Sequence, residues 1–247
     1  MKTTGNTVLI SGGSAGIGLE IAKLLEENGN KVIITGRSKE RLDNALTQLK
    51  NGIGIVNDFS KEADAKALAE TLAKDFPELN IVINNGAHAV VHDIVNDTDN
   101  YAAVESQMAT NFFSIVRLNE LLVNQLAKNS NAAIVNVSSV VAFVPGSLVG
   151  YSASKAALHS YTQAYRFALA QNNIPVKVFE LMPPLVNTEF SAVIGGEKGI
   201  PPRQVAEEFL AGLEADTYEI MVGNTQLLFD LYRKSPEEAF AILNAAE

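Results

Sequence analysis

The fold is decided by Thr7-Val-Leu-Ile-Ser-Gly-Gly-Ser-Ala-Gly-Ile-Gly18, an apolar run followed by a glycine-rich turn. Residues 7–10 predict a buried strand, and residues 17–28 predict a helix. Gly12, Gly16 and Gly18 fall where the strand turns into the helix, so backbone N–H groups there can approach a phosphate unobstructed. No lysine follows Gly18, so the turn is not the phosphate loop of nucleoside triphosphatases. A dinucleotide fits better, and a flexible turn without a ligand is the alternative.

Short apolar runs alternate with amphipathic stretches along the rest of the chain. Seven strands are predicted, at residues 7–10, 31–35, 53–56, 81–83, 132–137, 176–179 and 218–222. Several lack polar alternation, as expected of strands buried on both faces of a parallel sheet. Helices are predicted at residues 17–28, 39–50, 62–76, 101–128, 151–171 and 226–244. This order predicts one Rossmann-type, doubly wound α/β domain over residues 1–247, with a seven-stranded parallel sheet and helices on both faces.

Composition and charge narrow the possible partners. The net charge is −9, and the 19 lysines and arginines are scattered, so neither nucleic acid nor an anionic membrane is expected as a partner. The absence of cysteine excludes disulfides, thiolate metal sites and cysteine nucleophiles. No secretory signal and no apolar run of membrane-spanning length is found, so we expect a cytoplasmic protein.

The second predicted strand ends in Thr35-Gly36-Arg37-Ser38, where a Rossmann-type fold meets the adenosine ribose of its cofactor. An acidic residue there would bind the 2′-hydroxyl of NAD. Gly36 instead leaves room, and Arg37 offers planar donors suited to a 2′-phosphate. This predicts a preference for NADP(H), with NAD(H) possible; alternatively, Arg37 points into solvent. Asp58 follows the third strand and is expected to meet the adenine edge or to cap the next helix.

Lys155 follows Tyr151 by four positions in a predicted helix, which places a phenol and an ammonium on one face. A tyrosine has a pKa near 10 and needs a nearby cation to act close to neutral pH. A chance surface pair is the alternative. His88, His92 and Asp93 have spacing that raises a metal site, but no clear helix runs through them, so none is expected.

Together the motifs resemble the short-chain dehydrogenase/reductase family over about residues 7–188. They are the glycine turn, the turn Asn84-Asn85-Gly86-Ala87, Asn111, Ser138-Ser139, Tyr151-x3-Lys155 and residues 183–188. The resemblance implies hydride transfer between C4 of a nicotinamide and a carbonyl or carbinol carbon, with a homodimer or homotetramer built partly on the fourth and fifth helices.

The resemblance also implies the roles of individual residues. Tyr151 would protonate the developing alkoxide, and Ser139 would polarise the carbonyl. Lys155 would lower the tyrosine pKa and hold the nicotinamide ribose, while Asn111 would bind a water molecule. The residues expected to bind the cofactor are Gly12, Ser14, Gly16, Ile17, Gly18, Arg37, Asp58, Asn85, Gly86, Tyr151, Lys155, Pro183, Val186 and Thr188.

Three departures from the family pattern matter. Glycine and alanine are exchanged after Asn85, and Pro184 replaces a glycine and so removes a backbone donor. Ser138 lies at the usual spacing from Tyr151, whereas Ser139 fits the motif alignment. We choose Ser139, because a loop one residue shorter can absorb the difference.

Residues 189–215 are expected to form a lid over the substrate. Apolar walls near Phe143, Val144, His88 and Phe190 suggest a hydrophobic carbonyl substrate. The function predicted is NADP(H)-dependent interconversion of a carbonyl and a secondary alcohol. The alternatives are a ketoacyl reductase acting on a carrier-bound thioester, although no basic docking patch is evident, and a non-catalytic NAD(P)-binding regulator.

Overall fold

All seven predicted strands pair in one parallel sheet in the computed structural model, which describes residues 1–245. The strands are β1 (Thr7–Ser11), β2 (Lys31–Gly36), β3 (Ile53–Val56), β4 (Ile81–Asn84), β5 (Ala133–Val137), β6 (Lys177–Met182) and β7 (Glu219–Met221). Their order is β3-β2-β1-β4-β5-β6-β7, so the direction of winding reverses between β1 and β4. The predicted doubly wound fold is confirmed. Residues 246 and 247 of the predicted domain lie outside the described range.

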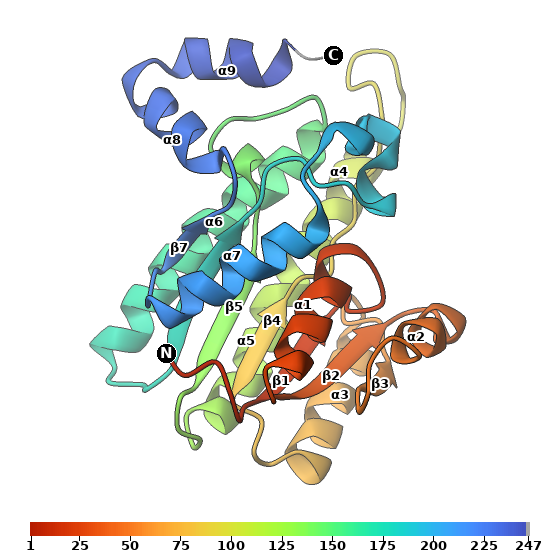
Figure 1. The fold of residues 1–247 in the computed structure, drawn as a ribbon. Helices are drawn as coiled ribbons and strands as arrows, with labels where there is room; N and C mark the ends of the chain where they lie inside the picture. Colours follow the sequence, from red (N-terminus) through yellow and green to blue (C-terminus); the bar gives the residue numbers. More distant parts are fainter. Residues whose placement is uncertain (246–247) are drawn as a thin grey trace.

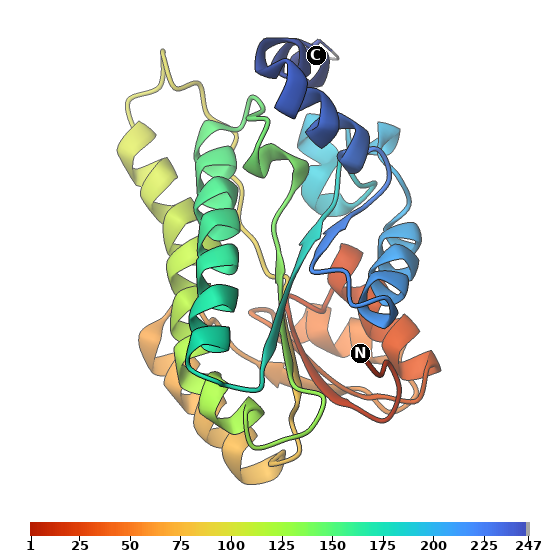
Figure 2. The same ribbon diagram turned by 90° about the vertical axis from the view of Figure 1, so that its left-hand side faces the viewer.

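Helices cover both faces of this sheet (Figures 1 and 2). One layer consists of α1 (Gly16–Glu27), α2 (Lys39–Leu46) and α7 (Pro202–Glu214), and the other of α3 (Glu62–Asp75), α5 (Ser114–Leu126) and α6 (Val149–Gln171). Adjacent strand residues serve opposite layers: Ile10 packs in the first core and Leu9 in the second. Because both faces are covered, the central strands carry apolar residues without alternation.

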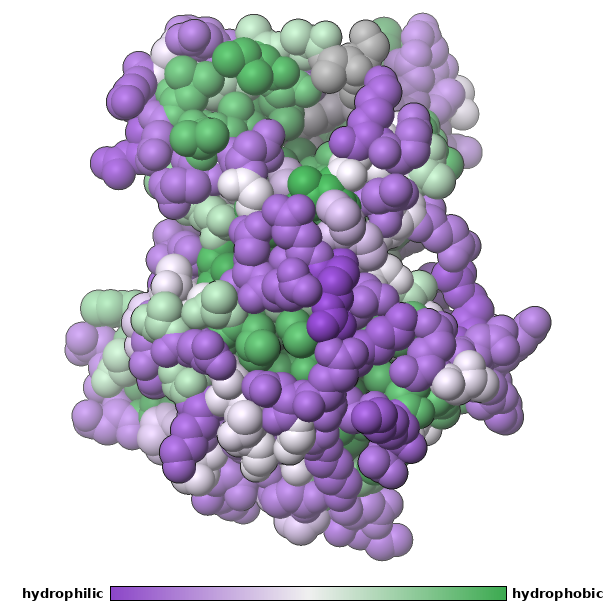
Figure 3. Space-filling model, viewed as in Figure 1, coloured by the Kyte–Doolittle hydropathy of each residue, from purple (hydrophilic) through white to green (hydrophobic). Residues whose placement is uncertain are grey.

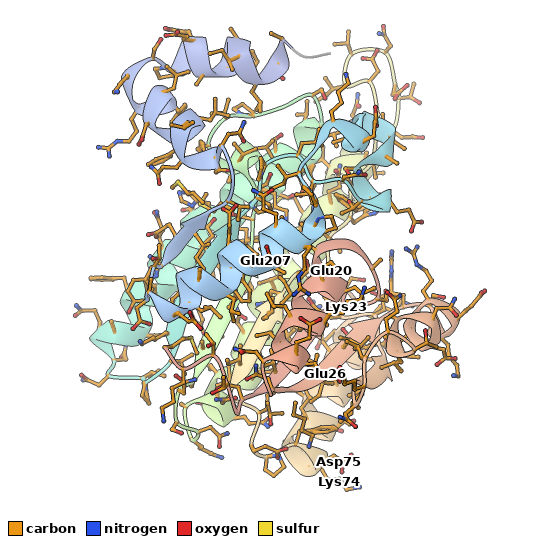
Figure 4. All side chains as sticks on the ribbon, in the orientation of Figure 1. Glu20, Lys23, Glu26, Lys74, Asp75 and Glu207 are labelled. Carbon is orange, nitrogen blue, oxygen red and sulfur yellow. The ribbon has the colours of Figure 1, made fainter. Side chains whose placement is uncertain are left out.

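The stretch expected as a lid divides into two parts. Residues 189–198 form two short 3₁₀ helices, η3 (Glu189–Ile194) and η4 (Gly196–Lys198). Helix α7 instead lies beside α1, and its Val205 and Phe209 are buried against the sheet. The outer surfaces of α1 and α7 are charged, as Glu20 and Glu207 show (Figure 4). Residues 189–198 therefore lie outside the hydrophobic core, whereas α7 is part of it.

The helix predicted at residues 101–128 is present from residue 100 to residue 126, but it contains a π-helical turn that the sequence did not predict. Helix α4 (Asn100–Met108) passes into a π-helical turn, η1 (Ala109–Phe113), before α5 begins. Such turns insert one extra residue per turn and are frequent at functional sites. Asn111 lies in this turn and is fully buried.

The last predicted helix, residues 226–244, is two helices, α8 (Thr225–Lys234) and α9 (Pro236–Asn244). Pro236 has no N–H to donate and forces Ser235 out of the helical region, so the chain turns there. The pair packs on a third apolar cluster that includes Phe143 and Val144. Apolar side chains also gather on its outer surface (Figure 3), among them Leu227. Within residues 1–245, no helix combines the length and apolarity needed to cross a membrane.

Candidate active site

A cavity of about 400 Å³ opens at the carboxyl ends of the strands. It lies over the point where the winding reverses, which is where ligands bind in open α/β sheets. Twelve of the residues predicted for the site border it: Gly12, Ser14, Gly16, Ile17, Arg37, Asp58, Asn85, Gly86, Tyr151, Lys155, Pro183 and Thr188. Four others, Gly18, Asn111, Ser139 and Val186, are not among the residues that border it.

The glycine turn is locked against the asparagine turn that follows β4. The Asn85 side-chain amide donates to the carbonyls of Ser11 and Gly12, at 3.1 and 3.0 Å. A Cβ on Gly12 would lie 2.7 Å from the Gly86 Cα, and one on Gly18 would lie 2.4 Å from the Asn85 side-chain nitrogen. Gly18 is therefore required for packing, although it does not border the cavity.

The turn fits a dinucleotide pyrophosphate on the cavity side. Gly16 has a φ of +54°, a left-handed conformation that favours glycine, and it borders the cavity at the start of α1. Backbone N–H groups at a helix start are suited to an anion. Gly86, which stands where the family pattern has alanine, lies beside Gly12, and a Cβ on it would lie 2.5 Å from the Phe59 ring, so the exchange of glycine and alanine fits the local packing.

The adenosine end of the cavity holds two arginines. Arg37 is exposed at the cavity border, as expected. Ser38 caps α2 by accepting a hydrogen bond from the Arg41 N–H at 3.3 Å, which brings Arg41 to the same border. Arg41 also pairs with Glu189 at 2.6 Å across the mouth of the cavity. The sequence prediction missed Arg41; its position in the first turn after the ribose-binding segment was the available signal.

Asp58 does not cap the helix that follows it, which was one of the two roles considered for it. Its carboxylate accepts a hydrogen bond from the Ser60 hydroxyl at 2.6 Å and so shapes the turn before α3. It also borders the cavity. The Ser60 hydroxyl is used in this bond, and α3 begins after Lys61 without a side-chain cap.

Tyr151 and Lys155 share one face of α6, as their spacing predicts. The Lys155 Nζ lies 5.4 Å from the centre of the Tyr151 ring. Lys155 is only 1% exposed and donates to the Val137 carbonyl at 2.7 Å. Burial lowers the pKa of Lys155 to about 8, although the charge of Glu180 acts in the opposite direction.

The expected effect of Lys155 on Tyr151 is not found in this structure. Burial raises the pKa of Tyr151 above its usual value, whereas we expected the lysine to lower it. Desolvation disfavours the phenolate, and the ammonium lies beside the ring without a hydrogen bond to its oxygen in the described contacts. The phenol therefore holds its proton at neutral pH, as a proton donor must.

The two candidate serines are used differently. The Ser138 hydroxyl donates to the Glu180 carboxylate. The Ser139 hydroxyl accepts from the Val141 N–H and lies 3.4 Å from the Pro183 carbonyl, a weak contact. Ser138 borders the cavity and Ser139 does not, yet only the Ser139 hydroxyl is free of a strong charged partner.

Asn111 ties the π-helical turn to its surroundings. Its amide oxygen accepts from the His88 N–H at 2.7 Å, and its amide nitrogen donates to the His88 carbonyl and to the Ser154 hydroxyl. These bonds occupy the side chain, so a water molecule would have to be held by the backbone of the turn. The described residues include no group of three or more His, Asp or Glu side chains that could hold a metal ion.

The substrate side of the cavity differs from expectation. Phe190 borders it, and its ring centre lies 5.9 Å from that of Tyr151. Phe143 and Val144, expected in the same wall, instead pack in the cluster under α8, where Phe143 lies 5.0 Å from Phe229. Phe143 is held there by two aromatic side chains of α8, Phe229 and Tyr232, which are distant from it in the sequence.

The sheet, the glycine turn and the cavity at the reversal point define a dinucleotide-binding α/β domain. The family model for the short chain dehydrogenase matches residues 6–199. The chain is 38% identical over 253 residues to an uncharacterized oxidoreductase, DltE, of Bacillus subtilis (strain 168), and the match covers 100% of both chains.

Solved structures of short chain dehydrogenases have the same fold as this chain. A short chain dehydrogenase from Burkholderia cenocepacia J2315 in complex with NADP is 25% identical, with a TM-score of 0.86 and coverage of 98% of this chain and 99% of that one. A short chain dehydrogenase/reductase from Burkholderia phymatum in complex with NAD shares the fold at 19% identity, with a TM-score of 0.87 and 96% of each chain covered. The chain belongs to the short-chain dehydrogenase family of oxidoreductases, which confirms the family predicted from its motifs.

Proposed function

We propose that this protein is an NADP(H)-preferring oxidoreductase that interconverts a carbonyl and a secondary alcohol. The observation that carries the proposal is the placement of Tyr151 and Lys155 on one helix face at the border of the cavity that the glycine turn forms. The relative from Burkholderia cenocepacia was solved with NADP, which supports a nicotinamide cofactor here.

The residues divide the chemistry as follows. A bound nicotinamide supplies or accepts the hydride. Tyr151 donates its phenolic proton to the substrate oxygen in the reducing direction and takes it back in the oxidising direction. The Lys155 ammonium beside the ring stabilises the phenolate that remains. Ser139 donates a hydrogen bond to the same oxygen once the weak contact with Pro183 is given up.

The preference for NADP(H) rests on Gly36, Arg37 and Arg41. Gly36 leaves space beside Ser14, and both arginines border the cavity where the ribose would lie. Guanidinium groups bind phosphate in a planar, bidentate manner. The relative from Burkholderia phymatum was solved with NAD, so cofactor choice varies within this fold and depends on local residues.

The substrate class follows from the cavity wall. Phe190 is an apolar, half-exposed ring beside Tyr151, which favours a hydrophobic or amphiphilic carbonyl compound. We also propose a homodimer or homotetramer.

The function is tested by following NADPH oxidation with a panel of ketones, aldehydes and a carrier-bound ketoacyl thioester. We expect turnover with at least one hydrophobic ketone or aldehyde. Cofactor binding without turnover on any member of the panel would favour a non-catalytic regulator, and turnover confined to the carrier thioester would favour a ketoacyl reductase.

Cofactor preference is tested separately with Arg37→Ala, Arg41→Ala and the double variant. Losing a phosphate contact should raise the KM for NADPH about tenfold or more and leave that for NADH nearly unchanged. Glu40→Ala, on the same helix, is the matched control. Equal loss with both cofactors would contradict the 2′-phosphate assignment.

A further inference from the structure

A third ionisable residue continues the row that Tyr151 and Lys155 begin. His159 follows Lys155 by four residues on α6, so the three side chains lie on one face of the helix. The His159 ring contacts the Glu180 carboxylate on β6, with Nδ1 2.8 Å from Oε2. Tyr151 and Lys155 border the cavity, and His159, one turn further along the helix, contacts Glu180.

Glu180 is 0% exposed in β6, where its neighbours Phe179 and Leu181 are buried apolar residues. Its two oxygens have separate partners: the Ser138 hydroxyl donates to one, and His159 contacts the other. In the sheet, Glu180 pairs with Asn136, two residues before Ser138. A buried carboxylate is costly unless it is hydrogen-bonded and paired. An acidic residue retained at such a place requires an explanation beyond packing.

Lys155 needs a negative partner that its own hydrogen bonds do not provide. Its ammonium donates to the neutral carbonyl of Val137, which directly precedes Ser138. Glu180 lies on β6, the strand that pairs with β5 beside Val137. Its negative charge raises the pKa of Lys155, in opposition to the effect of burial. The other ionisable groups around this pair are Tyr151 beside Lys155, and the Arg166–Glu219 ion pair beyond His159.

We propose that Glu180 is a positioning residue of the active site, a buried carboxylate whose negative charge keeps Lys155 protonated. Through Ser138 and His159, it also joins the end of β5 to α6 and so fixes the height of Lys155 beside Tyr151. The inference rests on the acid/base role proposed for Tyr151 and Lys155. An acidic residue between buried apolar residues of a strand is the sequence signal that points to this role. The sequence prediction missed it because it ended the strand at Phe179, one residue before Glu180.

The proposal is tested by titrating Lys155 directly, with carbon-13 at the lysine Cε observed by NMR. Lys155→Met assigns the resonance. Glu180→Gln keeps the shape of the side chain and one acceptor oxygen, replaces the other oxygen with an NH2 donor, and removes the charge. We expect the pH midpoint of Lys155 to fall by about one pH unit in this variant. Glu219→Gln removes a charge at the matching register of β7 and is expected to leave the midpoint unchanged.

An unchanged midpoint in Glu180→Gln would overturn the proposal. If that variant fails to fold, Glu180→Asp keeps the charge but shortens its reach. The Lys155 midpoint should then lie below that of the wild type and the Ser138 and His159 contacts should be lost together. A wild-type midpoint in Glu180→Asp with those contacts broken would count against the positioning role.

Turnover distinguishes this proposal from the function on which it rests. If the wild type reduces no carbonyl substrate but its Lys155 midpoint depends on Glu180, only the proposed function fails. If the wild type is active and the Lys155 midpoint is independent of Glu180, only the positioning role fails.

Discussion

Burial acts on the two residues of the proposed acid/base pair in opposite directions. It raises the pKa of Tyr151, which keeps the phenol protonated, and it lowers the pKa of Lys155 to about 8, which weakens the ammonium. The pair therefore enters the reducing reaction with a proton on the phenol. What limits it at higher pH is the loss of the lysine charge.

The rate of reduction should depend on pH through Lys155. Because this side chain is charged below its pKa and neutral above it, we expect kcat/KM for reduction to fall as pH rises through about 8. In Lys155→Arg the guanidinium stays charged, so its activity should be lower overall but should show no fall in this range. A wild-type profile that stays flat well above this pH would contradict the role of Lys155.

At the level of elements, the contact between α6 and β6 holds the site together. His159 from the helix and Ser138 from the end of β5 both bind Glu180. Arg166, further along α6, donates to the Val178 carbonyl of β6 at 2.7 Å and pairs with Glu219 on β7. With the bond from Lys155 to the Val137 carbonyl of β5, the helix that carries Tyr151 is attached to three neighbouring strands by side chains, in addition to its apolar packing.

The contact between His159 and Glu180 should make stability depend on pH. The hydrogen bond to Glu180 raises the pKa of His159 above its unfolded value. Its contribution is therefore fully present below the unfolded pKa of about 6.5 and is lost as pH rises through the folded pKa. In urea unfolding, His159→Gln should lower the free energy of unfolding by about 1 kcal/mol more near pH 6 than near pH 9.

His92→Gln is the matched control, because His92 lies in the segment between β4 and α4 with its ring beside the Val90 carbonyl. The effect of His159→Gln is compared with that of His92→Gln at each pH. An equal effect of His159→Gln at the two pH values would show that the carboxylate does not hold the histidine charge.

The elements that sequence failed to predict have local physical causes. The alternation of apolar runs and amphipathic helices was enough for the sheet and for five of the helices that cover it. The π-helical turn at Asn111 depends on bonds to His88 and Ser154, which are distant in sequence. Pro236 was a local signal for a break, but the apolar pattern on both sides of it favoured one continuous helix.

In the site, too, features set by neighbouring residues could be predicted, and features set by contacts between distant segments could not. Glycines and the Tyr151–Lys155 spacing are local signals, and the structure brings those residues to one cavity. Phe143 was misplaced because its partner, Phe229, comes from a later helix. Glu180 was missed because its role depends on residues from two other elements.

For the whole molecule, exposed aromatic residues indicate a face available to a second copy. Phe113, at the π-helical turn, is 56% exposed, and Phe167 on α6 is 66% exposed. We expect light scattering to give a mass two or four times the 26.5 kDa of the chain. Replacing both with Asp should lower that mass, whereas Val95→Asp, on the loop before α4, should not. A monomer in the wild type would contradict this expectation.

We propose that Tyr151 is the acid and base of a nicotinamide-dependent carbonyl reduction. The most direct measurement compares the wild type with Tyr151→Phe, using NADPH fluorescence for binding and NADPH oxidation for turnover, with Tyr165→Phe on the same helix as the control. We predict that Tyr151→Phe binds NADPH within a few-fold of the wild type and loses about 100-fold or more in kcat, while Tyr165→Phe keeps both. Full turnover by a Tyr151→Phe protein that binds NADPH would contradict the account.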